Sequence, residues 1–95
     1  MVARVKQASE EAYENFWHMP LNDEHRGYNK SNWGADICNM PSSRFGSASS
    51  AAAFLEAFIE EDRPWVHMDI ACGIFNEKDI GGIGAKTLLY LINNL

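Results

Sequence analysis

The stretch from Pro64 to Gly73 constrains the fold of this chain more than any other. It reads PWVHMDIACG, with bulky side chains on both faces of an expected strand from Trp65 to Ala71 and small residues typical of a turn after it. Few other segments could pair with such a strand. A single strand leaves its backbone N–H and C=O groups without partners, and two paired strands are only marginally stable in water. The sequence therefore predicts that this chain is one part of a larger sheet.

Length and composition support the same expectation. The chain has 95 residues, of which 46% are apolar, and it carries three Trp, five Phe and three Tyr. A chain of this size forms one domain at most, residues 1–95, and buries roughly 60–65% of its unfolded surface. A core this small would not enclose so many large side chains, so part of the apolar surface is expected to contact another chain or a further segment.

Charge and cysteine usage exclude several classes of partner. Eight basic against 13 acidic residues give a net charge of −5, which offers no basic patch for nucleic acid. No apolar run approaches the ~20 residues that cross a bilayer, and the first six residues lack the apolar core of a signal peptide. Without an export signal, Cys38 and Cys72 are expected to be reduced thiols. These features predict a cytoplasmic protein that contacts neither nucleic acid nor membrane.

Periodicity predicts four helices, and an Asn at position 22 is expected to cap the second. The predicted helices are Val2–Phe16, Asp23–Lys30, Ala48–Glu60 and Ala85–Asn93, with a brief extended piece at Ala35–Cys38. The expected inward faces are Val2, Val5, Ala8, Ala12 and Phe16 in the first helix, Ala51, Ala52, Leu55, Phe58 and Ile59 in the third, and Leu88, Leu91 and Ile92 in the last. The order helix, short helix, loop, helix, strand, helix is typical of an α/β layer.

Two groups of polar residues allow a chemical and a structural interpretation. His67 and Asp69 share one face of the expected strand and could form a metal pair or an acid–base dyad, and Cys72 could be a thiol nucleophile. The structural interpretation, hydrogen-bonded core groups and a small buried Cys, is favoured. Five serines between Ser42 and Ser50 could offer donors to an anion, but a capping and close-packing run is the favoured interpretation.

Several blocks of sequence, in order and over nearly the whole chain, resemble the C-terminal part of the catalytic domain of the leucyl aminopeptidases, also called cytosol aminopeptidases. The blocks are FWHMPL at 16–21, ADI at 35–37 followed by Asn39, RFG at 44–46, AA at 51–52 with FL at 54–55, WVHMDIA at 65–71, and GIG at 82–84 with TL at 87–88. This resemblance implies that the chain is the helix-loop-helix-strand-helix portion of a larger three-layer α/β/α domain.

The resemblance also implies an activity and a set of partners. Such enzymes are two-metal hydrolases that release N-terminal amino acids from peptides, using two divalent ions, zinc, manganese or magnesium. Their metal ligands lie upstream, in segments that include an NTDAEGR run that this sequence lacks. We therefore expect no metal ligand in this chain and no activity from it alone. The implied partners are the remainder of the aminopeptidase chain, further copies in a cytoplasmic hexamer, and a peptide substrate.

By the same resemblance, three residues are expected to line the substrate site. Ala71 and Ile74 match positions in the pocket for the substrate's first side chain, and Met40 matches a position on the side that accepts the departing residue. Packing alone is the alternative role for all three. An apolar wall gains roughly 0.8 kcal/mol per buried methylene of substrate, which favours Leu-like residues without sharp exclusion.

The sequence departs from the family pattern at three positions. Cys72 and Ser47 stand where the family usually has Gly, and Gly81 stands where a Thr is common. These departures concern the shape of the pocket.

Two other functions remain open beside a share in a peptidase. The chain could be a relic or paralogue that serves as a structural or interaction subunit without catalysis. It could also be an independent small enzyme that uses His67, Asp69 or Cys72.

Overall fold

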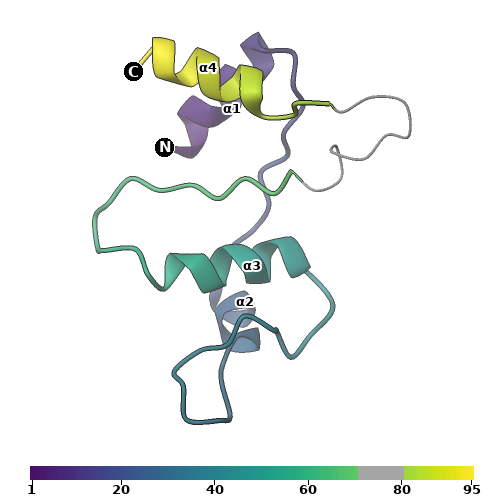
Figure 1. Ribbon diagram of the computed structural model, residues 1–95, viewed down its shortest axis with the longest axis vertical. Helices are drawn as coiled ribbons and strands as arrows, with labels where there is room; N and C mark the ends of the chain where they lie inside the picture. The colour runs from purple at the N-terminus through teal and green to yellow at the C-terminus, as the bar shows by residue number, and fades with distance from the viewer. Residues whose placement is uncertain (71–80) are drawn as a thin grey trace. The chain divides into compact units, whose positions relative to one another are not determined.

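The regular structure of the described residues is helical. The computed structural model describes residues 1–70 and 81–95. Its helices are α1 (Val2–Glu11), α2 (Asp23–Tyr28), α3 (Ser47–Glu56) and α4 (Ala85–Asn93), shown in Figure 1. They belong to two compact units. In the first, which comprises Met1–His18 and Met68–Leu95, α1 packs against α4, and in the second, Met19–His67, α2 packs against α3.

Helix α1 ends five residues before the predicted Phe16. Tyr13 adopts a left-handed conformation with φ 55°. Its N–H donates to the Glu10 carbonyl at 3.2 Å, and the Glu14 N–H donates to the Ser9 carbonyl at 2.9 Å. These two bonds form a Schellman motif, which satisfies the last carbonyls of a helix and usually has Gly at the left-handed position. Because Tyr occupies that position here, no residue type in the sequence signals where α1 ends.

Helix α2 begins where the sequence predicts and ends two residues early, at Tyr28. The Asn22 Oδ1 accepts hydrogen bonds from the backbone N–H groups of Glu24 at 3.1 Å and His25 at 3.3 Å. In return, the His25 Nδ1 accepts from the Asn22 N–H at 3.3 Å. This reciprocal capping box satisfies three otherwise unpaired N–H groups. The predicted cap at Asn22 is confirmed.

Helix α3 spans Ser47–Glu56, so the predicted end at Glu60 is wrong. The predicted face is also wrong in part, because Ala51 is exposed and the Leu55 and Phe58 side chains are 44% and 67% exposed. The buried residues of α3 are small ones, namely Ser49, Ser50, Ala52 and Ala53. Small side chains let a second backbone approach closely, and in this unit that backbone belongs to α2.

Helix α4 has the predicted bounds, Ala85–Asn93, but not the predicted burial. Its buried residue is Thr87, whereas Leu88 and Ile92 are 47% and 63% exposed. The expectation that these two apolar residues face inward is therefore wrong for the described structure. The polar Thr87 is buried because its hydrogen-bonding groups have a partner inside the first unit.

The predicted strand is absent from the described residues. Residues 65–70 have no regular secondary structure; most are half-buried, Asp69 is exposed, and Ala71 lies outside the described residues. The predicted extended piece at Ala35–Cys38 makes one antiparallel bridge, between Lys30 and Ile37. The α/β assignment is thus not visible in the described part of the chain. A segment without a neighbouring strand cannot form a ladder, which is the physical reason for the difference.

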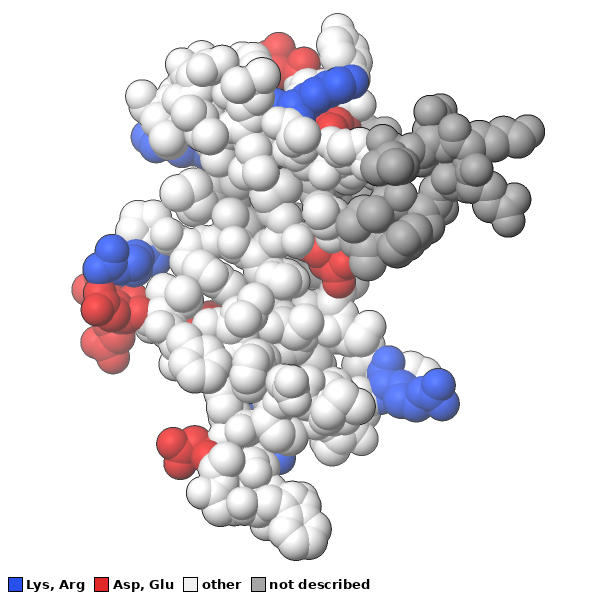
Figure 2. All heavy atoms as spheres, viewed as in Figure 1, with Lys and Arg blue, Asp and Glu red and all other residues white. Residues whose placement is uncertain are grey.

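The buried apolar residues of the described ranges are few and small. They are Val5, Ala8, Ala52 and Ala53. Large apolar side chains remain exposed in both units, among them Trp17 at 87%, Trp33 at 93% and Leu89 at 61%. On the face shown in Figure 2, charged groups are scattered and most of the surface carries no charge. None of the helices at residues 1–70 and 81–95 is long and apolar enough to cross a membrane.

Candidate functional site

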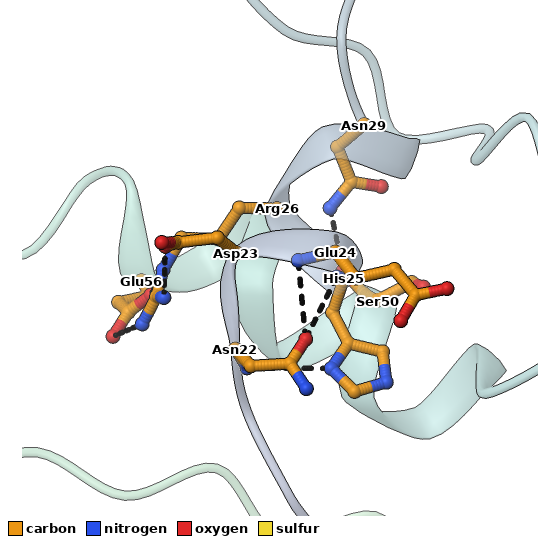
Figure 3. Close-up of polar contacts among 8 residues, drawn as sticks. All are labelled: Asn22, Asp23, Glu24, His25, Arg26, Asn29, Ser50 and Glu56. Atoms are coloured by element: carbon orange, nitrogen blue, oxygen red, sulfur yellow. Dashed lines mark hydrogen bonds and ion pairs between the residues drawn. The ribbon is translucent and has the colours of Figure 1, made fainter.

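Asn29 connects three segments of the second unit. Its side chain is buried, with 2% of the residue exposed, and its Nδ2 donates to the Ser50 carbonyl of α3 at 2.7 Å. Its backbone carbonyl accepts from the Cys38 N–H at 2.8 Å. Figure 3 shows Asn29 reaching from the end of α2 toward Ser50. Asn29 therefore fixes α2, α3 and the following loop to one another.

An ion pair adds a second link between α2 and α3. The Arg26 guanidinium donates to both carboxylate oxygens of Glu56, at 2.7 and 3.1 Å, and to Asp23 at 2.9 Å. These bonds, first that with Glu56 and then that with Asp23, raise the pKa of Arg26. Figure 3 shows the contact of Arg26 with Glu56, which lies apart from the capping box at the start of α2. Because the Arg26 and Glu56 side chains are partly exposed, their ion pair contributes little to stability. Its main effect is to orient α2 relative to α3.

Met40 projects from a loop whose backbone is held on both sides. Before it, Cys38 is bonded to the Asn29 carbonyl, and the Cys38 Sγ donates to the Met40 carbonyl at 3.1 Å. After it, the Ser42 N–H donates to the Tyr28 carbonyl at 2.8 Å. The Met40 side chain is 78% exposed. This predicted site residue thus stands on an anchored loop with its apolar side chain free for contact.

The serine run serves packing and local turns. The Ser49 Oγ donates to the Pro20 carbonyl at 2.6 Å, and the Ser43 Oγ accepts from the Phe45 N–H at 3.2 Å. The N-cap of α3 is Gly46, with φ 63° and no side-chain cap. Close packing is confirmed for Ser49 and Ser50, which are buried, but not for Ser42 and Ser47, which are exposed. The predicted side-chain capping of α3 is wrong.

One departure from the family pattern is explained by the same turn. Gly46 supplies the left-handed residue before α3, and Ser47 is already helical. A second Gly at position 47 is therefore not needed for the backbone of this helix start.

The first unit has a carboxylate at the start of α4 that sequence reasoning missed. The Glu14 Oε2 accepts from the Gly84 N–H at 3.2 Å, the Thr87 N–H at 3.0 Å and the Thr87 hydroxyl at 2.6 Å. The Thr87 hydroxyl, the backbone N–H groups and the Lys86 charge hold the pKa of Glu14 below its ordinary value, against the opposing effect of burial. Seventy residues separate Glu14 from Gly84, and no local pattern signals such a contact.

Each unit has a groove among its described residues. A groove of about 350 Å³ is lined by Glu56, Ile59, Glu60, Glu61, Arg63 and Trp65. A second, of about 190 Å³, lies along α1 and α4 and is lined by Arg4, Gln7, Ala8, Tyr90, Leu91 and Asn94. Glu56 and Glu60 are already paired with arginines. Neither groove includes Met40, and neither gathers a catalytic set of polar groups.

The other predicted residues are only partly placed. Ala71 and Ile74, like Cys72, lie outside the described residues. His67 is half-buried and belongs to the second unit, while Asp69 is exposed and belongs to the first. Across residues 1–70 and 81–95, no three His, Cys, Asp or Glu side chains are grouped so as to hold a metal ion.

Comparison with known proteins decides the family. The profile described as "Cytosol aminopeptidase family, catalytic domain" matches residues 1–89. The chain belongs to the cytosol aminopeptidase family. The resemblance inferred from the motifs is thereby confirmed.

Three relatives illustrate the extent of the cytosol aminopeptidase match. A probable cytosol aminopeptidase of Nitrosomonas europaea is 45% identical over 75% of this chain and 14% of the relative. One of Aquifex aeolicus is 34% identical over 93% of this chain and 19% of the relative. Leucine aminopeptidase 2, chloroplastic, of Arabidopsis thaliana is 35% identical over 99% of this chain and 16% of the relative. The chain thus spans less than a fifth of the length of these relatives, and no solved structure matches it.

Proposed function

We propose that this chain is part of a two-metal leucyl aminopeptidase that releases N-terminal amino acids from peptides, and that it supplies wall and packing of the substrate site. The observation that carries the proposal is the family match over residues 1–89. The relatives' names specify cytosol and leucine aminopeptidases. We infer a peptide as substrate, the cytoplasm as location and a homo-oligomer, a hexamer by resemblance, as the assembly.

The exposed apolar side chains support a role inside a larger domain. On α4, Leu88, Leu89 and Ile92 are 47%, 61% and 63% exposed. Full burial of such a side chain is worth about 1.5–3 kcal/mol. A neighbouring layer that covered α4 would therefore add stabilisation that the described contacts do not supply. The remainder of an aminopeptidase chain is the partner that the family match favours.

Within the site, we assign Met40 to the side that receives the departing part of the peptide, and Ala71 and Ile74 to the pocket for the first side chain. The anchored backbone around Met40 would keep the base of its side chain in a fixed position while a substrate binds. Such a contact excludes water and favours apolar residues without polar selection. Ala71 and Ile74 rest on the sequence resemblance alone.

The two divalent ions, zinc, manganese or magnesium, would be held by the remainder of the protein. The described residues offer no group of ligands for them. When bound, such ions activate water and stabilise the developing oxyanion. The contribution of this chain is to bind and orient the peptide beside them.

The proposal is tested by hydrolysis of leucine p-nitroanilide by the chain alone and by the complete protein that carries it. We expect activity from the complete protein, loss of activity with a chelator, and none from the chain alone. A complete protein that binds no metal and hydrolyses no aminoacyl substrate would favour the alternative, a catalytically inactive paralogue with a structural role. If the isolated chain is active and His67→Ala abolishes that activity, the independent small enzyme would be favoured instead.

A further inference from the structure

We propose that His25 is an acid-sensitive clasp between the start of α2 and the start of α3. Its neutral imidazole contacts both helix starts, and its protonation releases them. The proposal goes beyond the peptidase function and does not depend on it. It concerns the second unit alone, which contains both helices.

The first contact of the His25 ring is with the residue that caps α2. The His25 Nδ1 accepts a hydrogen bond from the Asn22 N–H at 3.3 Å, and Figure 3 shows the ring turned back toward Asn22. A backbone N–H can only donate, so Nδ1 carries a lone pair and the ring is neutral, with its proton on Nε2. Glu or Gln usually fills this place in a capping box. His25 therefore gives the cap a dependence on pH that Gln would not give.

The second contact of the ring is with the start of α3. A Cβ at Gly46, the N-cap of α3, would lie 3.2 Å from the His25 Nε2 and 3.3 Å from its Cδ2. These distances are shorter than side chains ordinarily keep, so the ring packs directly on the Gly46 backbone. The Gly46 carbonyl in turn accepts from the Ser50 N–H at 2.9 Å, which begins the hydrogen bonding of α3. One half-buried ring thus contacts the first residues of both helices.

Protonation of His25 would reverse the first contact. An imidazolium has a donor on each nitrogen, so an Nδ1–H would face the Asn22 N–H. The positive charge would also lie in the first turn of α2, where the helix dipole disfavours cations. A ring that turns away from Asn22 also leaves Gly46, because both contacts depend on one orientation of the side chain. Histidine is the side chain that ordinarily changes charge between about pH 5 and about pH 8.

The charged side chains around His25 are engaged with other partners. On α2, Asp23 pairs with Arg26, which also pairs with Glu56, the acid of α3. Glu24 accepts from the hydroxyl of Tyr28, whose ring meets the His25 ring edge-on at 6.4 Å between centroids. In the segment that leads into α3, the nearest charge in sequence is that of Arg44, which has the same sign as an imidazolium. Among the residues that the structure describes, no carboxylate forms an ion pair with His25.

The test follows amide hydrogen exchange in the complete protein at about pH 8 and about pH 5, the limits of ordinary histidine titration. Rates are expressed as protection factors, which remove the intrinsic effect of pH on exchange. The Arg26 N–H reports on α2, since it donates to the Asn22 carbonyl at 3.2 Å, and the Ser50 N–H reports on α3. Both protection factors should fall about fivefold at the lower pH, the size expected for one lost N-cap contact.

Two variants separate His25 from the other histidines. His25→Gln keeps an acceptor at this place and cannot become charged, so the Arg26 amide should stay protected at both pH values. His18→Gln replaces an exposed histidine of the first unit and should keep the pH dependence of the wild-type protein.

Two results would overturn the proposal. One is equal protection of Arg26 and Ser50 at both pH values in the wild-type protein, and the other is a loss of protection in His25→Gln as large as in wild type. Should His25→Gln fail to fold, the wild-type protein decides, because exchange of the imidazole C2 hydrogen reports protonation of His25 directly. A loss of Arg26 protection at a pH clearly different from that of ring protonation would then overturn the proposal. No readout uses peptidase activity, so failure of the proposed function leaves this test intact.

Discussion

Asn29→Asp tests most directly whether this side chain holds α2, α3 and the following loop together in the second unit. The Asn29 Nδ2 donates to the Ser50 carbonyl at 2.7 Å in a site where 2% of the residue is exposed. An ionised Asp would lose this donor and bring a buried negative charge against a carbonyl oxygen. An unpaired buried charge costs about 3 kcal/mol or more. Since 1.4 kcal/mol is a factor of ten, exchange of the Cys38 amide hydrogen should be about 100-fold faster at pH 7 in the complete protein.

The effect should depend on pH in a stated direction. Burial beside a carbonyl raises the pKa of the introduced Asp in the folded state above its unfolded value of about 3.9. The protonated acid can donate to the Ser50 carbonyl, so the loss of stability should be small below about pH 4 and grow as pH rises toward the folded-state pKa. Asn39→Asp, in an exposed loop, is the matched control. Two results would refute the reasoning. One is a Cys38 amide that exchanges at pH 7 as slowly in Asn29→Asp as in the control. The other is an equal loss of stability in Asn29→Asp at about pH 4 and at pH 7.

Three further changes have defined outcomes. Gly84→Ala should lower the free energy of unfolding by about 1–2 kcal/mol, because φ at this position is 88°. Gly27→Ala should raise the free energy of unfolding by up to about 1 kcal/mol, because Gly27 lies within α2 and a Cβ there would meet open space. Urea unfolding measures both variants, and equal effects would contradict the account. Arg26→Gln should lower the melting temperature slightly at low salt and have no effect in about 1 M salt, since its pair with Glu56 is partly exposed; a loss independent of salt would argue against this ion pair as the cause. Met40→Ala should reduce kcat/KM for Leu-Leu relative to Leu-Gly by about tenfold, while Met19→Ala should not.

Local signals in the sequence predicted the helix starts well. Asn22 and the acids after it located α2, and the glycines before Ala85 located α4 with both of its bounds. The end of α1 was missed because its left-handed residue is Tyr13 instead of Gly. This helix end depends on two backbone hydrogen bonds, from Tyr13 to Glu10 and from Glu14 to Ser9, which no residue type in the sequence signals.

Burial and long-range contacts were predicted less well. Apolar periodicity marked Leu55, Leu88 and Ile92 as inward, yet all three are exposed in the described structure. Periodicity identifies a face that should be covered but does not say by what, and the covering layer need not belong to the residues in hand. The cap of α4 by Glu14 joins residues about 70 positions apart, which local pattern cannot reveal. Of the predicted site, only Met40 lies in the described residues, and its loop is well anchored.

The proposed function implies that this chain depends on the remainder of an aminopeptidase for its stability as well as for metal ions. Differential scanning calorimetry of the isolated 95-residue chain tests this directly. With only small residues buried in the described ranges, we expect no cooperative transition. A single sharp peak with an enthalpy of about 0.7 kcal/mol per residue, typical of an autonomous globular domain, would contradict the account.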